Sequence, residues 1–78
     1  MTTVKILGPG CANCRRLETV AREAAANAGI EAEFVKVTDM KDIIAHEVFA
    51  TPGLVIDEKV VSSGRIPTAA EIRQWLAH

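Results

Sequence analysis

Apolar residues gather in short runs at four places along the chain, and these runs predict β-strands. Two of them, at residues 3–7 and 31–37, are rich in β-branched and other apolar side chains. The other two, at residues 54–56 and 60–61, flank the polar stretch 57–59, which is typical of a hairpin turn whose charged side chains are solvated. The pattern therefore predicts two separate strands followed by a compact hairpin.

Helical spacing of apolar residues fills the intervals between these strands. From residue 12 to about residue 28, such positions are Cys14, Leu17, Ala21, Ala24, Ala25 and Ala28, and Gly29 provides a C-terminal stop. Asp39 can cap a short helix that reaches about residue 47. Thr68, with Glu71 three residues later, has the signature of a capping box at the start of a last helix.

The resulting element order is β-α-β-α-β-β-α. Two strands joined by a helix form a right-handed parallel crossover, and the hairpin adds an antiparallel pair. The sequence therefore predicts an α/β fold with a four-stranded mixed sheet and helices on both faces. With 78 residues, we expect one domain that spans residues 1–78.

Composition excludes several classes of function. The net charge of −1 gives no electrostatic basis for binding nucleic acid or an acidic membrane surface. No segment approaches the roughly 18 consecutive apolar residues that a membrane span requires. The N-terminus has no basic segment followed by a long apolar run, so a secretory signal is not expected. We expect a cytoplasmic monomer without nucleic-acid or membrane partners.

The two cysteines, Cys11 and Cys14, are the main candidates for chemistry, and they follow a bend at Gly8-Pro9-Gly10. If the chain is helical from residue 12, positions i and i+3 share one face, so a disulfide can form without backbone distortion. A bridge that closes so small a loop contributes about 2 kcal/mol at most. Such a bond is better suited to being made and broken, and in a reducing cytoplasm the pattern indicates redox or metal chemistry.

The expected position of Cys11 favours its thiolate, which is the form that attacks a disulfide. At the mouth of the first helix, Cys11 would lie near unpaired backbone N–H groups and the positive end of the helix dipole. Arg15 and Arg16 add positive charge one turn along.

This combination resembles the thioredoxin-like superfamily in its minimal, glutaredoxin-sized form, and most closely the small archaeal and bacterial redox-active disulfide proteins. The resemblance rests on the segment from Gly8 to Cys14 after the first strand, and on Thr51-Pro52-Gly53 before the third. It implies a thiol–disulfide oxidoreductase in which Cys11 is the attacking nucleophile and Cys14 the buried resolving thiol of a redox disulfide.

The same resemblance implies that Pro52 is cis after Thr51, and that this loop packs beside the sulfurs and presents main-chain groups to an extended substrate segment. The implied partners are a protein disulfide substrate and a dithiol or reductase electron donor; we expect no cofactor and no metal. The chain departs from its better-known relatives at Lys5, where typical thioredoxins have a buried carboxylate. Residues 62–65 do not match the element with which glutaredoxins bind glutathione.

Binding of a soft metal, copper(I) or a metalloid, is the alternative function for the same cysteines. A strand, a Gly-containing loop and C-x-x-C also open small heavy-metal-binding domains, but these usually have Met where this chain has Pro9, and they end on a strand. His46 and His78 have no recognisable ligand spacing. Of the aromatic residues, we expect Phe34 and Trp75 in the core. Phe49 is expected either in the core or on an apolar rim around the disulfide.

Overall fold

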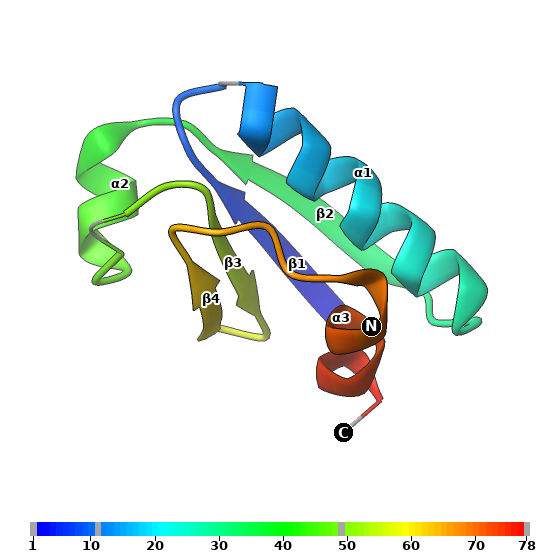
Figure 1. Ribbon diagram of the computed structural model, residues 1–78. Coiled ribbons are helices and arrows are strands. Elements are labelled where there is room, and N and C mark those ends of the chain that lie inside the picture. The colour runs from blue at the N-terminus through cyan, green and yellow to red at the C-terminus, as the bar shows by residue number, and fades with distance from the viewer. Residues whose placement is uncertain (1, 11, 49, 78) are drawn as a thin grey trace.

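The computed structural model describes residues 2–10, 12–48 and 50–77, and the elements follow the predicted order β-α-β-α-β-β-α (Figure 1). The call on Phe49 and that on His78 lie outside the described residues. The elements are β1 (Thr2–Leu7), α1 (Ala12–Asn27), β2 (Ala32–Val37), α2 (Met40–Ala45), β3 (Gly53–Ile56), β4 (Lys59–Ser63) and α3 (Ala69–Leu76).

The sheet is mixed, as predicted, with strand order β2-β1-β3-β4. β1 pairs in parallel with β2 and antiparallel with β3, which in turn pairs antiparallel with β4. Because Leu7, the last residue of β1, is opposite Gly53, the first of β3, the loop that leaves β1 and the loop that enters β3 meet at one edge of the sheet. Residues 8–14 and 51–52 are therefore neighbours although about forty positions separate them.

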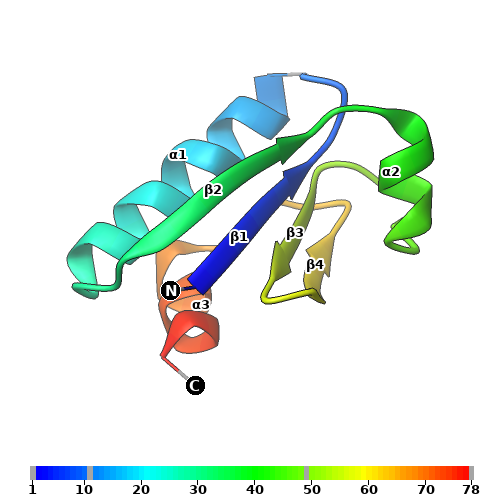
Figure 2. The same ribbon diagram turned by 180° about the vertical axis from the view of Figure 1, so that it is seen from behind.

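Helices cover both faces of the sheet, which confirms the predicted layers (Figure 2). On one face, α1 and α3 share a larger core with β1 and β3, made by Val4, Ile6, Leu17, Ala21, Ala24, Ala25, Leu54, Ile56, Ile72 and Leu76. On the other face, α2 contributes to a smaller core of Leu7, Ile43, Val48 and Val55. Alternate residues of β1 and β3 point to opposite sides, so each strand serves both cores.

Two helices end earlier than predicted. α1 ends at Asn27, which leaves Ala28 exposed rather than on the buried face, and Gly29 has a left-handed φ of 67°. Such a glycine is the usual reason for a helix to end, because it has no Cβ to clash. α2 ends at Ala45, since His46 is its C-cap and Glu47 has a φ of 62°, which takes the backbone out of the helical region.

Phe34 and Trp75 are only half-buried, so the prediction that they lie inside the core is wrong. Both pack against the outside of the larger core. Phe34 lies on the edge strand β2, where the ring is covered by the Arg22 guanidinium, 4.5 Å from the ring centroid. An edge strand has a neighbour on one side only, which leaves part of a large side chain in contact with water.

The charged hairpin tip is anchored to β1, whereas the sequence predicted a merely solvated turn. Asp57 and Glu58 both have positive φ, 49° and 68°, which is the geometry of a tight two-residue turn. The Asp57 carboxylate accepts a hydrogen bond from the Thr3 amide at 2.9 Å. Lys5 forms an ion pair with Glu58 at 2.6 Å, so a cation on β1 is paired with the hairpin.

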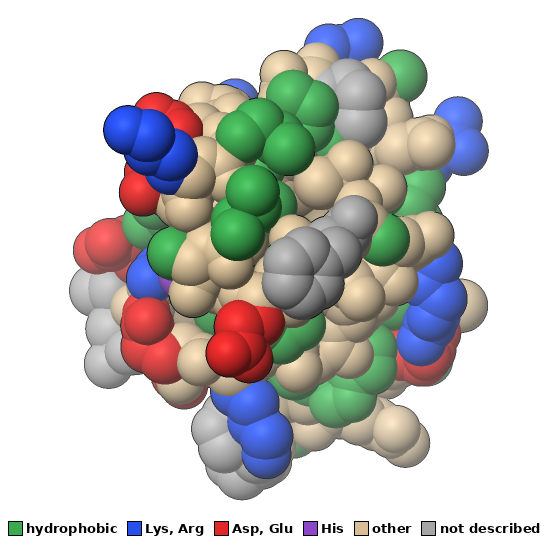
Figure 3. All heavy atoms as spheres, turned by 90° about the vertical axis from the view of Figure 1, so that its left-hand side faces the viewer, with side chains coloured by type: hydrophobic (Ala, Val, Ile, Leu, Met, Phe, Trp, Pro, Cys, Tyr) green, Lys and Arg blue, Asp and Glu red, His purple; other side chains and the backbone are tan. Residues whose placement is uncertain are grey.

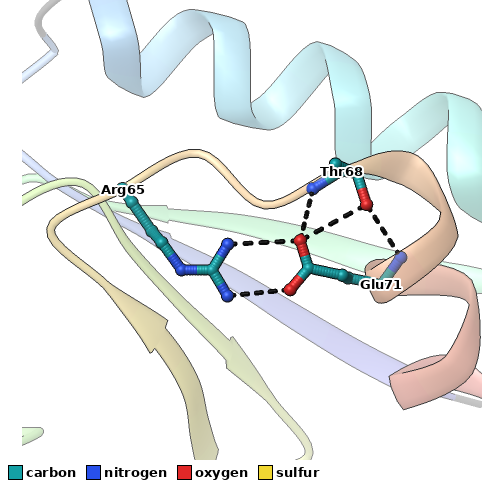
Figure 4. A network of polar contacts seen from close by, with 3 residues as sticks. All are labelled: Arg65, Thr68 and Glu71. Carbon is teal, nitrogen blue, oxygen red and sulfur yellow. Dashed lines mark hydrogen bonds and ion pairs between the residues drawn. The ribbon is translucent and has the colours of Figure 1, made fainter.

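The predicted capping box at the start of α3 is present (Figure 4). The Thr68 hydroxyl accepts a hydrogen bond from the Glu71 amide at 3.2 Å, and the Glu71 carboxylate accepts one from the Thr68 amide at 3.0 Å. Arg65 adds two hydrogen bonds to the same carboxylate, at 2.8 and 3.2 Å. The hydrogen bonds from Arg65, followed by the one from the Thr68 backbone, lower the pKa of Glu71 to about 2.

Among the described residues, none of the helices has the length and apolar character that a membrane crossing needs.

Candidate active site

Cys14 lies in the first turn of α1, at the sheet edge where the loops before α1 and β3 meet. Its side chain is buried, with 5% of its surface exposed. Cys11, the other candidate cysteine, lies outside the described residues and directly precedes the first residue of α1. The assignments of Cys11 as nucleophile and Cys14 as resolving thiol remain predictions.

Gly8 is the residue on which this site is packed. A Cβ added to Gly8 would overlap the Cys14 sulfur and lie 3.4 Å from Cys14 Cβ and 3.8 Å from Thr51 Cβ. The Gly8 amide donates a hydrogen bond to the Val37 carbonyl at 2.9 Å, which holds the loop against β2. The glycine is therefore needed for the close approach of the sulfur. Sequence reasoning identified Gly8 only as part of a bend, since nothing local in the sequence indicates which side chain will face it.

The loop before β3 completes the arrangement. The Thr51–Pro52 peptide bond is cis, as the resemblance implied. Thr51 is exposed, Pro52 is buried, and the Pro52 carbonyl accepts a hydrogen bond from the Gly64 amide at 3.0 Å. Since Thr51 and Cys14 approach the same glycine, the structure brings the predicted substrate-binding loop next to the buried thiol.

A pocket of about 280 Å³ opens beside Cys14, between the start of α1 and the ends of β1 and β2. Its lining includes Gly8, Gly10, Cys14, Arg15, Glu18 and Lys36. Sequence reasoning missed Glu18 and Lys36. Glu18 could have been found, because it follows Cys14 by four positions and so shares its helix face. Lys36 could not, because only the parallel register of β1 and β2 brings it there.

The charged residues of the pocket are linked to one another. The Glu18 carboxylate is 2.9 Å from Arg22 Nε and 3.4 Å from Lys36 Nζ. The hydrogen bond from Arg22 is the main cause that lowers the pKa of Glu18, and Lys36 acts in the same direction. Arg15 donates a hydrogen bond from Nη1 to the Gly10 carbonyl at 3.0 Å, which ties the first turn of α1 to the preceding loop.

The α2 side of the molecule has exposed apolar side chains. Met40 and Ile44, one turn apart on α2, are 56% and 51% exposed. Figure 3 views the molecule from this side and shows hydrophobic side chains gathered in the upper and central part, with many of the charged side chains toward the margins.

The histidine and metal calls concern residues at some distance from this packing. His46 is half-buried, caps α2, and has its Nδ1 2.7 Å from the Asp42 carbonyl, which agrees with a structural role. Among the described residues, no three His, Cys, Asp or Glu side chains are grouped so that they could hold a metal ion. That search does not include Cys11, on which the copper(I) alternative depends.

Comparison with known proteins identifies the family. A family model described as "Thioredoxin domain" matches residues 2–77, nearly the whole chain. The chain belongs to the thioredoxin family. The resemblance inferred from the residues around Cys14 and Pro52 is thereby confirmed.

Two archaeal relatives named thioredoxin support this membership. The protein from Methanothermobacter thermautotrophicus is 42% identical over 77 residues, covering 99% of this chain and 100% of its own length. The protein from Methanocaldococcus jannaschii is 41% identical over 76 residues, covering 97% of this chain and 87% of its own length. These relatives support a thioredoxin-like redox role for the chain.

Among solved structures, a chain titled "C- Orthorombic NaGST1" is similar to 99% of this chain, with a TM-score of 0.51 and 22% sequence identity. The present chain spans 35% of that longer chain. At this level of identity the likeness shows the thioredoxin-like fold alone.

Proposed function

We propose that this thioredoxin-family chain is a thiol–disulfide oxidoreductase that uses Cys11 and Cys14 to exchange a disulfide with protein partners in the cytoplasm. In the reducing direction, the Cys11 thiolate attacks the partner disulfide, forms a mixed disulfide and releases the first partner thiolate. Cys14 then attacks the Cys11 sulfur, which forms the Cys11–Cys14 disulfide and releases the second partner thiolate. A dithiol protein or a reductase returns two electrons to restore the dithiol.

The observation that carries this proposal is the packing of the Cys14 sulfur beneath Gly8, next to Thr51. A buried thiol is shielded from a bulky protein disulfide, so the attacking role falls to Cys11, the other cysteine of the pair. A resolving thiol need only reach the neighbouring cysteine three residues away, and the helical spacing allows this without backbone rearrangement.

Protein substrates would bind along the loop of Thr51 and Pro52. Thr51 is exposed beside the covered sulfur, so the backbone of an extended segment could lie against this loop. Met40 and Ile44 supply exposed apolar surface on the neighbouring α2 side, which favours a partner with apolar side chains around its disulfide.

Trapping experiments test the two cysteine roles separately. Cys14→Ser should accumulate a mixed disulfide with a model protein disulfide such as insulin, because the resolving step is lost. Cys11→Ser is the matched control and should accumulate little adduct, since its remaining thiol is buried. Mass spectrometry after rapid acid quenching measures both species. Adducts of equal yield, or adducts formed only through Cys14, would contradict the assignment.

The copper(I) alternative is an outcome of a second assay on the wild-type chain. Reduced protein is titrated with copper(I) against a chelator of known affinity, and insulin reduction is followed in parallel. We expect ready exchange with insulin and weak competition for copper(I). Strong competition for the metal without measurable exchange would favour the metal-binding function.

A further inference from the structure

The pocket beside Cys14 exists because two of the loop residues have no side chain. Gly8 packs against the Cys14 sulfur, where any Cβ would overlap it. Gly10 has a φ of 89°, and an added Cβ there would meet nothing within 4 Å, so the loop is thin where it borders the pocket. Cys14 thus lines a space of about 280 Å³ although only 5% of its surface is exposed. A small molecule in this space would be next to a thiol that a protein partner cannot reach.

The charges around the pocket favour an anion. Arg15 and Lys36 contribute two cations to the lining, and Glu18 contributes one carboxylate. That carboxylate is already engaged by Arg22 and Lys36, and the pKa of Glu18 is lowered by the hydrogen bond from Arg22. Counting Arg22, three cations surround one anion. Arginine presents several N–H donors in a plane that matches a carboxylate or sulfonate, which makes Arg15 the main candidate for contact with the ligand.

The size of the pocket limits the ligand. Pockets for drug-sized molecules usually start at about 300 Å³. A space of about 280 Å³ that is open to solvent therefore suits a shorter molecule with one acidic group and a reactive end a few bonds away.

We propose that this pocket binds a small anionic thiol, which reduces the oxidised protein by attack on the Cys14 sulfur. The proposal rests on the proposed function, since it requires the Cys11–Cys14 disulfide. The acidic group of the ligand lies against Arg15 and Lys36, and its thiolate is directed toward Cys14.

The chemical steps balance as follows. The ligand thiolate forms a bond to the Cys14 sulfur, the Cys11–Cys14 bond breaks, and Cys11 leaves as a thiolate. A second ligand thiolate then attacks the ligand sulfur of this mixed disulfide, which releases the symmetrical ligand disulfide and the Cys14 thiolate. Two ligand thiols are oxidised, and the protein gains two electrons and two protons. Attack at Cys14 is chemically favoured, because a thiol with a stabilised anion leaves faster and Cys11 is the cysteine expected to have one.

The kinetic test compares two reductants of similar size at matched thiolate concentration, 3-mercaptopropionate, which is anionic, and 2-mercaptoethanol, which is neutral. Arg15→Gln and Lys36→Gln should each slow reduction by 3-mercaptopropionate about two- to fivefold, as expected for the loss of one exposed charge contact. Neither variant should change reduction by 2-mercaptoethanol. Glu18→Gln should act in the opposite direction and accelerate the anionic thiol.

Arg16→Gln is the matched control, because Arg16 is exposed on the same turn of α1 and does not line the pocket. It removes the same charge from the same helix end, so its effect measures general electrostatics alone. An equal slowing by Arg16→Gln and Arg15→Gln would overturn the proposal. So would an equal effect of Arg15→Gln on the neutral and the anionic thiol.

A binding measurement that needs no redox reaction separates this proposal from the proposed function. Propanesulfonate, which has no thiol, is titrated into reduced protein, and amide NMR shifts are followed. We expect saturable shifts at Gly8, Gly10 and Lys36, weakened in Arg15→Gln and kept in Arg16→Gln. Absence of saturable shifts there would overturn the pocket. Failure of the proposed function is a different result, in which neither dithiothreitol nor any monothiol changes the protein because no disulfide forms.

Discussion

The two faces of the sheet are built to different depths. The face of α1 and α3 has a core of ten buried residues, and α1 alone extends over sixteen positions. The face of α2 has a core of four, and its helix has six residues. Packing stabilises a helix mainly through the apolar face that it buries, and a helix of six residues would not persist in isolation.

This difference assigns separate tasks to the two faces. The larger core fixes α1, and with it the depth at which Cys14 is held against Gly8. The smaller core supports the segment that leads through Val48 to the Thr51–Pro52 loop, and α2 also exposes Met40 and Ile44. Regions with few buried apolar contacts open more readily than the rest of a domain. We therefore expect the α2 face to be the more easily opened side of the active site.

Truncation of one buried side chain on each face tests this difference most directly. Leu17→Ala should lower the free energy of unfolding by about 3–4 kcal/mol, because Leu17 is fully buried between α1 and the sheet. Ile43→Ala should cost less, about 2–3 kcal/mol, since the short α2 can shift to fill part of the cavity. Urea unfolding followed by circular dichroism measures both values.

Amide exchange on the wild-type protein complements these variants. We expect the amides of α2 to exchange through local opening, at a free energy below that of global unfolding, while those of the central part of α1 require global unfolding. Equal protection of the two helices, together with equal costs for the two truncations, would contradict the division into a deep and a shallow face.

The N-caps of α2 and α3 offer a second comparison with smaller effects. Thr68→Ala removes the capping box of α3 and should cost about 1–2 kcal/mol, because α3 packs into the larger core. Asp39→Ala removes a carboxylate that accepts one hydrogen bond from the Lys41 amide, at 2.9 Å, and should cost about 0.5–1 kcal/mol. Thermal unfolding of both variants at neutral pH measures the difference, and a larger cost for Asp39→Ala would reverse the ranking of the two faces.

The fold was largely predictable from the sequence because its signals are local and repeated. Strand runs, helical spacing and two N-caps gave every element in order. Helix ends were less accurate, since the left-handed backbone at Glu47 has no sequence signature of the kind that Gly29 supplies. The ties of Asp57 and Glu58 to β1 were also missed, because they depend on strand order, which brings residues more than fifty positions apart together.

The candidate site was predictable where the motif itself is informative and not where packing decides. Cys14 and Thr51 were singled out from the sequence, and they do meet in space. The residue on which they meet, Gly8, looks like any turn glycine in the sequence. Lys36 comes to the pocket only through the parallel pairing of β2 with β1, and neither neighbouring sequence nor residue type indicates that position.

Acid should remove the electrostatic part of the α3 cap within a defined pH window. The pKa of Glu71 is lowered to about 2, first by Arg65, so the carboxylate stabilises the folded state fully above its usual pKa of 4.5. This contribution declines as the pH falls through about 2, where the folded state also takes up the proton. The difference in urea midpoint between wild type and Glu71→Gln should therefore be largest near pH 6 and shrink toward pH 2.

Glu58 provides the control for this titration on the other face. Its pKa is also lowered, first by its hydrogen bond with Lys5, so Glu58→Gln should show a pH dependence of the same sign. Because Glu58 lies at the hairpin tip and not at a helix cap, we expect a smaller difference at neutral pH. A difference for Glu71→Gln that does not change between pH 6 and pH 2 would show that the Arg65 contact does not act through the charge of the carboxylate.

The smallest expected effect on stability comes from Ile44→Gln, and it separates burial from helix position. Ile44 is 51% exposed, whereas its neighbour Ile43 is 1% exposed on the same short helix. An exposed substitution of this kind usually changes stability by less than about 0.5 kcal/mol, so Ile44→Gln should unfold in urea much like the wild type while Ile43→Ala does not. If Ile44 serves partner contact, the same variant should slow insulin reduction without changing reduction of the protein by dithiothreitol. A cost above about 1 kcal/mol that grows with protein concentration would instead indicate that Ile44 is covered by a second copy of the chain.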